Sequence, residues 1–208
     1  MKNSKIAVAA ISLLMFFSLP AFAQKGDLKF DINYNYSVPG SQFKSDLVHN
    51  NSPRGLKAGL MYSFNDKLAA GLSLGFQDYY EKYPRATYSL GKTQDISAVL
   101  TNSIQTTPIL LKARYNPLPS NTFLKPYISI AAGTNIVDFK QYFGEFSSGH
   151  TSAGFMAEGG LGVMIPFKKS GASGINLGAA YNYAPYNKDG YHDLNSVNFH
   201  AGITFRIQ

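Results

Sequence analysis

The chain contains no cysteine and no tryptophan, and charged residues make up only 15% of its 208 positions. The absence of cysteine excludes disulfide bonds, a thiol nucleophile and an acylated lipoprotein terminus. Soluble domains usually carry about 25% charged residues, so the low charge indicates that part of the surface faces a nonpolar solvent. The formal net charge is +7, but no run of lysine and arginine concentrates it, and we expect no nucleic-acid partner.

The one long apolar stretch lies near the N-terminus and is too short to cross a bilayer as a helix. Two lysines precede an apolar run over residues 6–19, which is followed by a proline and a small-residue cleavage site at residues 21–23. A spanning helix needs about 20 apolar residues, whereas this order of segments is typical of a secretory signal. We expect residues 1–23 to be a cleaved signal peptide and residues 24–208 to form the mature domain.

After residue 27, no stretch shows the 3.6-residue period of an amphipathic helix, and apolar residues instead recur at every second position. In the first such segment, Phe30 and Ile32 lie on one face and Asp31 and Asn33 on the other. This alternation predicts eight β-strands. They lie at residues 28–38, 56–64, 68–76, 104–115, 125–135, 153–167, 175–183 and 196–208.

Short and long connections alternate between these segments. The short ones are residues 65–67, 116–124 and 168–174, the long ones are residues 39–54, 78–103 and 137–152, and residues 187–195 are intermediate. Because every second connection is short, we predict an up-and-down meander with compact turns at one end and long loops at the other. Pro108 has no N–H for the sheet, so we expect a bulge or weak pairing in the fourth strand.

The composition of the polar face indicates which face meets water. A water-exposed face normally carries about 25–35% charged residues, yet the polar face of the third segment has none. It consists of Ala69, Gly71, Ser73, Gly75 and Gln77. Small and amide side chains suit the crowded interior of a narrow barrel, which leaves the apolar face outside, in lipid.

Aromatic residues on the apolar face gather near the strand ends, as expected at the two interfaces of a bilayer. Examples are Tyr34 and Tyr36 in the first segment and Phe199 and Phe205 in the last. A strand in lipid cannot keep an unpaired edge. We therefore predict that the last segment pairs with the first and closes the barrel.

The stretch TTPILLKARYNPLPSNTFLKPYISIAAGTN, residues 106–135, contains a proline-bearing apolar strand, a turn, the triplet KPY and a glycine-ended strand. In this it resembles the small eight-stranded outer-membrane barrels of the OmpA, OmpX and OmpW type, and the resemblance covers about residues 26–208. It implies an all-β fold, an eight-stranded antiparallel up-and-down transmembrane β-barrel in the bacterial outer membrane, with periplasmic turns and outer loops. Gln208 and the lack of tryptophan depart from many family members.

An eight-stranded barrel is just wide enough to be filled by side chains, and strand parity places several charged residues inside it. We predict an interior charge network of Asp31, Lys112, Arg114, Glu158 and Arg206, with Lys29 and Lys57 also facing inward. Asp31 is expected near Arg206, because the first and last strands are neighbours. Lys112 and Arg114 are the candidate partners of Glu158. Buried charges must be paired or hydrated, so we interpret the network as structural, with a gate for small solutes as the alternative.

A catalytic alternative rests on GHTSAGFMAE, which contains His150, Ser152 and Glu158, the residue types of a Ser-His-acid hydrolase. This stretch distantly resembles the His-x-Ser of lipid A deacylase barrels. All three positions share the inward parity, however, whereas a lipid-cleaving site must reach the membrane. We therefore expect no enzymatic activity, and a lipid A hydrolase is the third hypothesis.

We expect no cofactor and no metal, although His49, His150 and His192 fall in loops at the same end, where neutral imidazoles can share a metal. The expected partners are outer-membrane lipids and lipopolysaccharide, and the outer-membrane assembly machinery. Aromatic residues in the long loops suit either an extracellular ligand or packing on one another. The sequence thus predicts an integral outer-membrane barrel with a structural or loop-mediated interaction role; a narrow channel or transporter for small solutes is the alternative.

Overall fold

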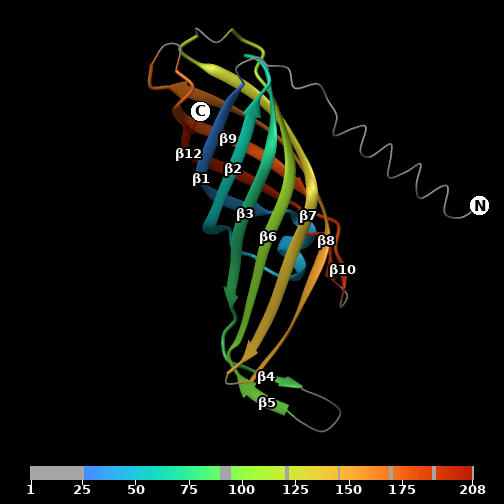
Figure 1. Cartoon of the computed structure of the whole chain (residues 1–208). Coiled ribbons are helices and arrows are strands. Elements are labelled where there is room, and N and C mark those ends of the chain that lie inside the picture. Colours follow the sequence, from blue (N-terminus) through green and yellow to red (C-terminus); the bar gives the residue numbers. More distant parts are fainter. Residues whose placement is uncertain are drawn as a thin grey trace, which may run out of the picture.

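The computed structural model is a closed barrel of eight antiparallel strands, ordered β1-β12-β9-β8-β7-β6-β3-β2 around the ring (Figure 1). The structure describes residues 26–89, 95–119, 122–144, 146–168, 171–188 and 191–207. The predicted signal peptide lies outside these residues. The last strand pairs with the first, with Ile32 opposite Ile203, so the predicted closure is confirmed.

Each of the eight predicted segments overlaps one strand of the ring. The strands are β1 (Asp27–Pro39), β2 (Ser52–Ser63), β3 (Leu68–Lys82), β6 (Leu100–Tyr115), β7 (Lys125–Phe143), β8 (Phe146–Pro166), β9 (Gly174–Tyr183) and β12 (Ser196–Arg206). In addition to the ring strands, the described residues form one short helix and two small hairpins. These are α2 (Ser41–Asp46), β4 (Ala86–Ser89) with β5 (Asp95–Ala98), and β10 (Asn187–Lys188) with β11 (Tyr191–His192). Among the described residues, no helix has the length and apolarity to span a membrane.

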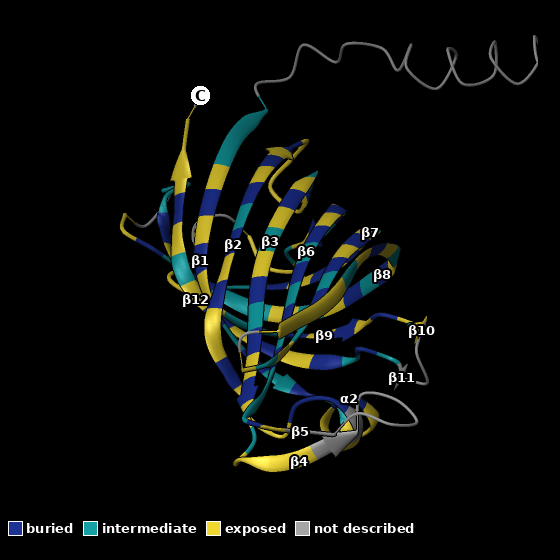
Figure 2. Cartoon of the chain, turned by 90° about the horizontal axis from the view of Figure 1, so that it is seen from below, coloured by how far each residue is buried: buried dark blue, intermediate teal, exposed yellow. Residues whose placement is uncertain are grey.

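Exposed and buried residues alternate along every strand of the ring, as the two-residue period predicts (Figure 2). Leu111 is 70% exposed on the outer face, while its neighbours Leu110 and Lys112 are buried inside. The exposed aromatics form two rings. One contains Phe30, Tyr62, Phe64, Tyr115, Phe167 and Phe205, and the other Tyr34, Phe76, Phe155, Tyr181, Tyr183 and Phe199. Between them the outer surface consists mainly of leucine, isoleucine, valine and alanine.

The two ends of the barrel differ. The short connections lie at one end of the barrel, together with the start of β1 and the end of β12. We call this the turn end and the opposite one the loop end. At the loop end β3, β6, β7 and β8 extend well past the other strands, and the β4-β5 hairpin lies beyond the tips of β3 and β6 (Figure 1). The barrel rim is therefore strongly asymmetric.

The prediction of a long loop at residues 137–152 was wrong, and that at residues 78–103 was wrong in part. In the first case β7 and β8 continue to a tight turn, with Phe143 opposite Phe146 and Gly144 at a φ of 65°, a conformation that favours glycine. In the second, β3 and β6 continue to Lys82 and Leu100. Strand pairing does not have to stop at the edge of the lipid, so the apolar pattern underestimates the strand length.

Pro108 interrupts the ladder between β3 and β6, which confirms the expected weak pairing. Leu74 pairs with Ile109 and Gln77 with Thr106, but no pairs join the residues between them. The register is the same on both sides of the gap, so the strand carries no bulge. The proline ring lies over Gly75, where a Cβ would be 2.8 Å from its Cγ.

The segment after β1 folds back into the loop end of the lumen, and we call residues 40–51 the loop plug. Phe43, Leu47 and Val48 are fully buried there, in a cluster that includes Tyr79 and Phe139. The Phe43 and Tyr79 rings meet edge to face at a centroid distance of 4.7 Å. Sequence periodicity missed this element, because a six-residue helix such as α2 is too short to show a helical pattern.

Two polar side chains of the barrel wall fasten the loop plug. The carboxylate of Glu81 accepts the backbone N–H of His49 and lies 3.1 Å from Nδ1 of the same residue. Asn102 donates its side-chain amide to the carbonyl of Leu47 at 3.4 Å. The loop plug is thus held by both apolar packing and hydrogen bonds.

Candidate functional site: the barrel interior

The centre of the lumen holds a buried ion triad. Glu158 on β8 forms ion pairs with Lys57 on β2 and with Lys112 on β6, whose Nζ lies 3.5 Å from Oε1. All three side chains are almost completely buried. A buried carboxylate with two lysine partners is compensated, whereas removal of that carboxylate leaves two ammonium groups unpaired in a poorly solvated interior. The triad ties three strands together across the barrel.

Next to the triad, three side chains contact one another in a row on the side of the turn end. The Arg114 guanidinium lies over the Tyr127 ring, with Cζ 4.2 Å from the centroid. Tyr127 Oη is 2.9 Å from His200 Nε2. Glycines make room for these groups, because a Cβ on Gly162 would lie 2.5 Å from Tyr127 Oη and one on Gly178 would lie 2.6 Å from His200 Nε2.

The tight packing around Gly178 can be tested by placing a larger side chain at this position. Gly178→Val is expected to lower the free energy of unfolding by about 1–3 kcal/mol, because the new side chain meets both His200 and the carbonyl of Leu161. Gly159→Val is the matched control on the neighbouring strand, since a Cβ there has nothing within 4 Å. Urea unfolding in detergent micelles measures both; equal effects would show that the interior is not tightly packed.

The structure places four of the five predicted network residues in the lumen. Asp31, Lys112, Arg114 and Glu158 are buried, and Lys112 lies next to Glu158. Arg114 pairs with no carboxylate of the described residues and contacts Tyr127 instead. Lys57, which the strand parity placed inside but which was not proposed as a partner, occupies the second position beside Glu158.

The predicted location of Arg206 was wrong. Its guanidinium is 2.7 Å from the carboxylate of Asp27, and its side chain is 52% exposed. The register of β1 and β12 explains the difference. Arg206 lies opposite Lys29, at the very end of β12, whereas Asp31 lies opposite Thr204, deeper in the barrel. Asp31 accepts a hydrogen bond from Asn33 at 2.8 Å. Arg206 therefore belongs to the rim and not to the interior network.

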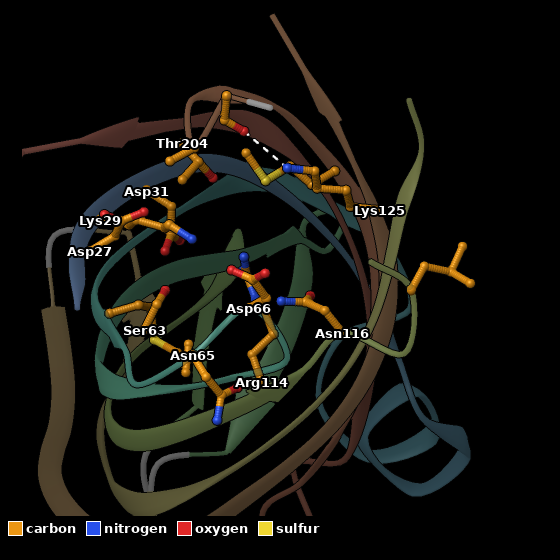
Figure 3. A pocket seen from close by; sticks show the side chains of 16 residues that line it. Asp27, Lys29, Asp31, Ser63, Asn65, Asp66, Arg114, Asn116, Lys125 and Thr204 are labelled. Carbon is orange, nitrogen blue, oxygen red and sulfur yellow. Dashed lines mark hydrogen bonds between the residues drawn. The ribbon is translucent and has the colours of Figure 1, made fainter. Parts of the chain in front are cut away.

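A polar cup opens at the turn end, with a volume of about 190 Å³ (Figure 3). Charged residues of both signs line it. They are Asp27, Lys29, Asp31, Asp66, Arg114 and Lys125. Lys125 donates to the carbonyl of Gly171 at 3.1 Å, and residues of all three short turns contribute to the wall. A second, smaller interior cavity of about 20 Å³ lies between the triad and the loop plug.

The sequence matches the family model described as outer membrane protein beta-barrel domain over residues 9–206. The chain belongs to this family. It is a small outer-membrane β-barrel protein, located in the bacterial outer membrane. The aromatic rings then mark the two membrane interfaces, and the turn end faces the periplasm, because such barrels carry short periplasmic turns and longer extracellular loops.

The chain is similar to several solved outer-membrane barrels. The neisserial surface protein A (NspA) is 13% identical, with a TM-score of 0.53 over 88% of this chain and 98% of that one. The E. coli outer membrane protein W is 18% identical (TM-score 0.46; 89% and 100% covered), and the N-terminal barrel of Pseudomonas aeruginosa OprF is 15% identical (TM-score 0.45; 87% and 100%). No curated protein matches the sequence.

Membership of this family predicts a simple biochemical behaviour. The unheated protein should migrate on a denaturing gel at a different position from the boiled protein, because the closed hydrogen-bonded ring resists detergent until it is heated. Comparison of heated and unheated outer-membrane fractions measures this. Recovery of the chain as a soluble periplasmic monomer would contradict it.

The residues of the hydrolase hypothesis do not form a triad in this barrel. His150 Nε2 is 2.8 Å from the hydroxyl of Tyr186, and Glu158 is engaged by two lysines. Ser152 is buried on the inner face of β8. Among the described residues, no group of three histidine or acidic side chains could hold a metal ion. The side chain of His192 lies outside the described residues.

Proposed function

We propose that this barrel is closed and non-catalytic, and that it acts as a structural outer-membrane component that presents an ordered outer surface. The observation that carries the proposal is the loop plug, which fills the extracellular half of the lumen with apolar side chains. Below it the ion triad crosses the barrel. An eight-stranded interior filled in this way leaves no room for a permanent water path.

The ordered surface is the part of the barrel that extends beyond the outer aromatic ring. Arg54 forms an ion pair with Asp78 at 3.2 Å and lies 5.2 Å from the centre of the Tyr80 ring. Further along, Lys140 donates to Asp138 at 2.6 Å, and this hydrogen bond lowers the pKa of Asp138. Exposed aromatic and charged groups held on long paired strands suit recognition of an extracellular ligand.

Lipids are the second class of partner in this proposal. The two aromatic rings suit the headgroup regions of the two leaflets, which in the outer leaflet are those of lipopolysaccharide. Delivery to the membrane would use the outer-membrane assembly machinery, since the barrel is expected to follow a signal peptide.

A narrow channel is the competing function, and the polar triad and the periplasmic cup are the features that favour it. It would require the loop plug to leave the lumen. A lipid A hydrolase finds less support, because the acid and the histidine are engaged with other residues. If cells that express the wild-type protein and cells that express Ser152→Ala both contain unchanged lipid A, the hydrolase hypothesis is excluded.

Gene deletion with complementation tests the proposed role. Deletion is expected to weaken the outer-membrane barrier, measured as leakage of a periplasmic enzyme, and the wild type is expected to restore it. A variant in which residues 86–98 are replaced by a short Asn-Gly turn separates the two parts of the role: it restores the barrier if the barrel suffices, and fails if the outer surface is needed. An intact barrier with selective loss of uptake of one small solute would instead indicate a transporter.

A further inference from the structure

We propose that the periplasmic cup binds a small solute that carries a carboxylate, with Arg114 as its main anchor. This inference is independent of the proposed function, because the cup lies on the opposite side of the ion triad from the loop plug. Lys29, Arg114 and Lys125 surround the cup from three different strands (Figure 3). The cup volume of about 190 Å³ suits a ligand somewhat larger than benzene, which a cavity of about 150 Å³ can hold.

None of the three cations that line the cup forms an ion pair with a carboxylate of the described residues, although Asp66 attracts both Lys29 and Lys125 electrostatically. Lys125 donates only to a backbone carbonyl, that of Gly171. Arg114 is only 7% exposed, and its Nε is buried without a hydrogen-bond partner in the described part of the chain. A guanidinium buried without a counter-charge is costly, and a carboxylate in the cup, which Arg114 lines, would supply one.

The acids around the cup are already engaged. Asp27 pairs with Arg206 at 2.7 Å, and Asp31 accepts the amide of Asn33 at 2.8 Å. Asp66 also has an interaction partner. The lining thus contains three acids and three bases, but Asp27 is paired with a cation outside the lining, so the cations of the cup are in excess.

The chemistry of the lining favours a carboxylate over other anions. The planar guanidinium of Arg114 matches a carboxylate in a two-point contact, and its stacking on Tyr127 holds it in one orientation. Three carboxylates nearby repel a multiply charged anion such as phosphate more strongly than a monoanion. The side chains of Ser63 and Asn116 add neutral donors at the wall.

Electrostatics at this end of the barrel also favours entry of an anion. The described cationic residues at the turn end outnumber the acidic ones. They are Lys29, Lys67, Arg114, Lys125, Lys168 and Arg206 against Asp27, Asp31 and Asp66. The resulting positive potential raises the local concentration of anions at the mouth of the cup.

The test uses the refolded mature chain, residues 24–208, in detergent micelles, with acetate and inorganic phosphate as probes at constant ionic strength. Titration with acetate is expected to shift the NMR signals of the Arg114 Nε–H and the Asn116 side-chain amide until they saturate. Phosphate is expected to bind at least fivefold more weakly. The absence of a saturable shift overturns the proposal, and tighter binding of phosphate overturns its carboxylate selectivity.

Variants separate the cup from a general effect of charge. Arg114→Gln is expected to weaken acetate binding at least tenfold, read on Asn116, and Arg114→Lys to weaken it less. Lys67→Gln is the matched control, because it removes an exposed cation at the same end that does not line the cup, and it should change the affinity less than twofold. If Arg114→Gln does not fold, as judged by heat-dependent gel mobility, Lys29→Gln is used in its place. This variant is expected to weaken acetate binding about threefold. Equal effects of the Arg114 and Lys67 variants would overturn the proposal.

Discussion

Glu158→Gln is expected to lower the free energy of unfolding by about 3–5 kcal/mol, because it leaves two buried lysines without a counter-charge. Lys57→Met should cost clearly less, since Glu158 keeps Lys112 as a partner at 3.5 Å. This order of effects follows from the central place of the carboxylate between the two ammonium groups. Urea unfolding in micelles, followed by circular dichroism, measures both variants.

Asp138→Asn provides the control for this prediction. It also removes a carboxylate from an ion pair with a lysine, but this pair lies on the exposed outer surface, where such contacts contribute about 0–1 kcal/mol. Equal destabilisation by the Glu158 and Asp138 variants would mean that the lumen around the triad is well hydrated. The triad would then not be a structural tie between the strands.

Val48→Asp is expected to expel the loop plug from the lumen. Val48 is completely buried in the apolar cluster, and burial of an unpaired carboxylate there costs several kcal/mol. In intact cells, external trypsin should then cut after Lys44 in α2 at least tenfold faster than in the wild type, because proteolysis requires local unfolding. Mass spectrometry of the fragments measures the rate.

Gln42→Asp is the matched control for the loop plug, since it adds the same charge to an exposed position of the same segment. It should leave the rate of cleavage close to that of the wild type. Rapid cleavage of the wild type itself would contradict the packed position of the loop plug.

The sequence was sufficient to predict the barrel, because a lipid-facing wall imposes a strict two-residue alternation. That alternation also placed Lys112, Arg114 and Glu158 on the inner face, where they are buried. It could not show which charges meet across the lumen, since this depends on strand stagger and side-chain reach. Lys57 was therefore not proposed as a partner of Glu158, and Arg206 was paired with the wrong aspartate.

The features at the loop end were the least predictable. The strand pairing of β7 and β8 continues past the membrane, where the outer face no longer has to be apolar, so the pattern that defines the strands fades. The loop plug could not be predicted for a related reason. Its burial depends on contacts of Phe43 and Leu47 with distant strands, and nothing in the local sequence reports those contacts.

The conductance of the refolded mature chain in a planar bilayer tests whether the lumen is closed. Heat-dependent gel mobility must first show that the protein in the bilayer preparation is folded. With the loop plug packed against Tyr79 and the triad below it, the inserted barrel should give no discrete current steps. Steps in the wild type, altered in size by Arg114→Ala, would show that water and ions cross the barrel and would contradict a closed lumen.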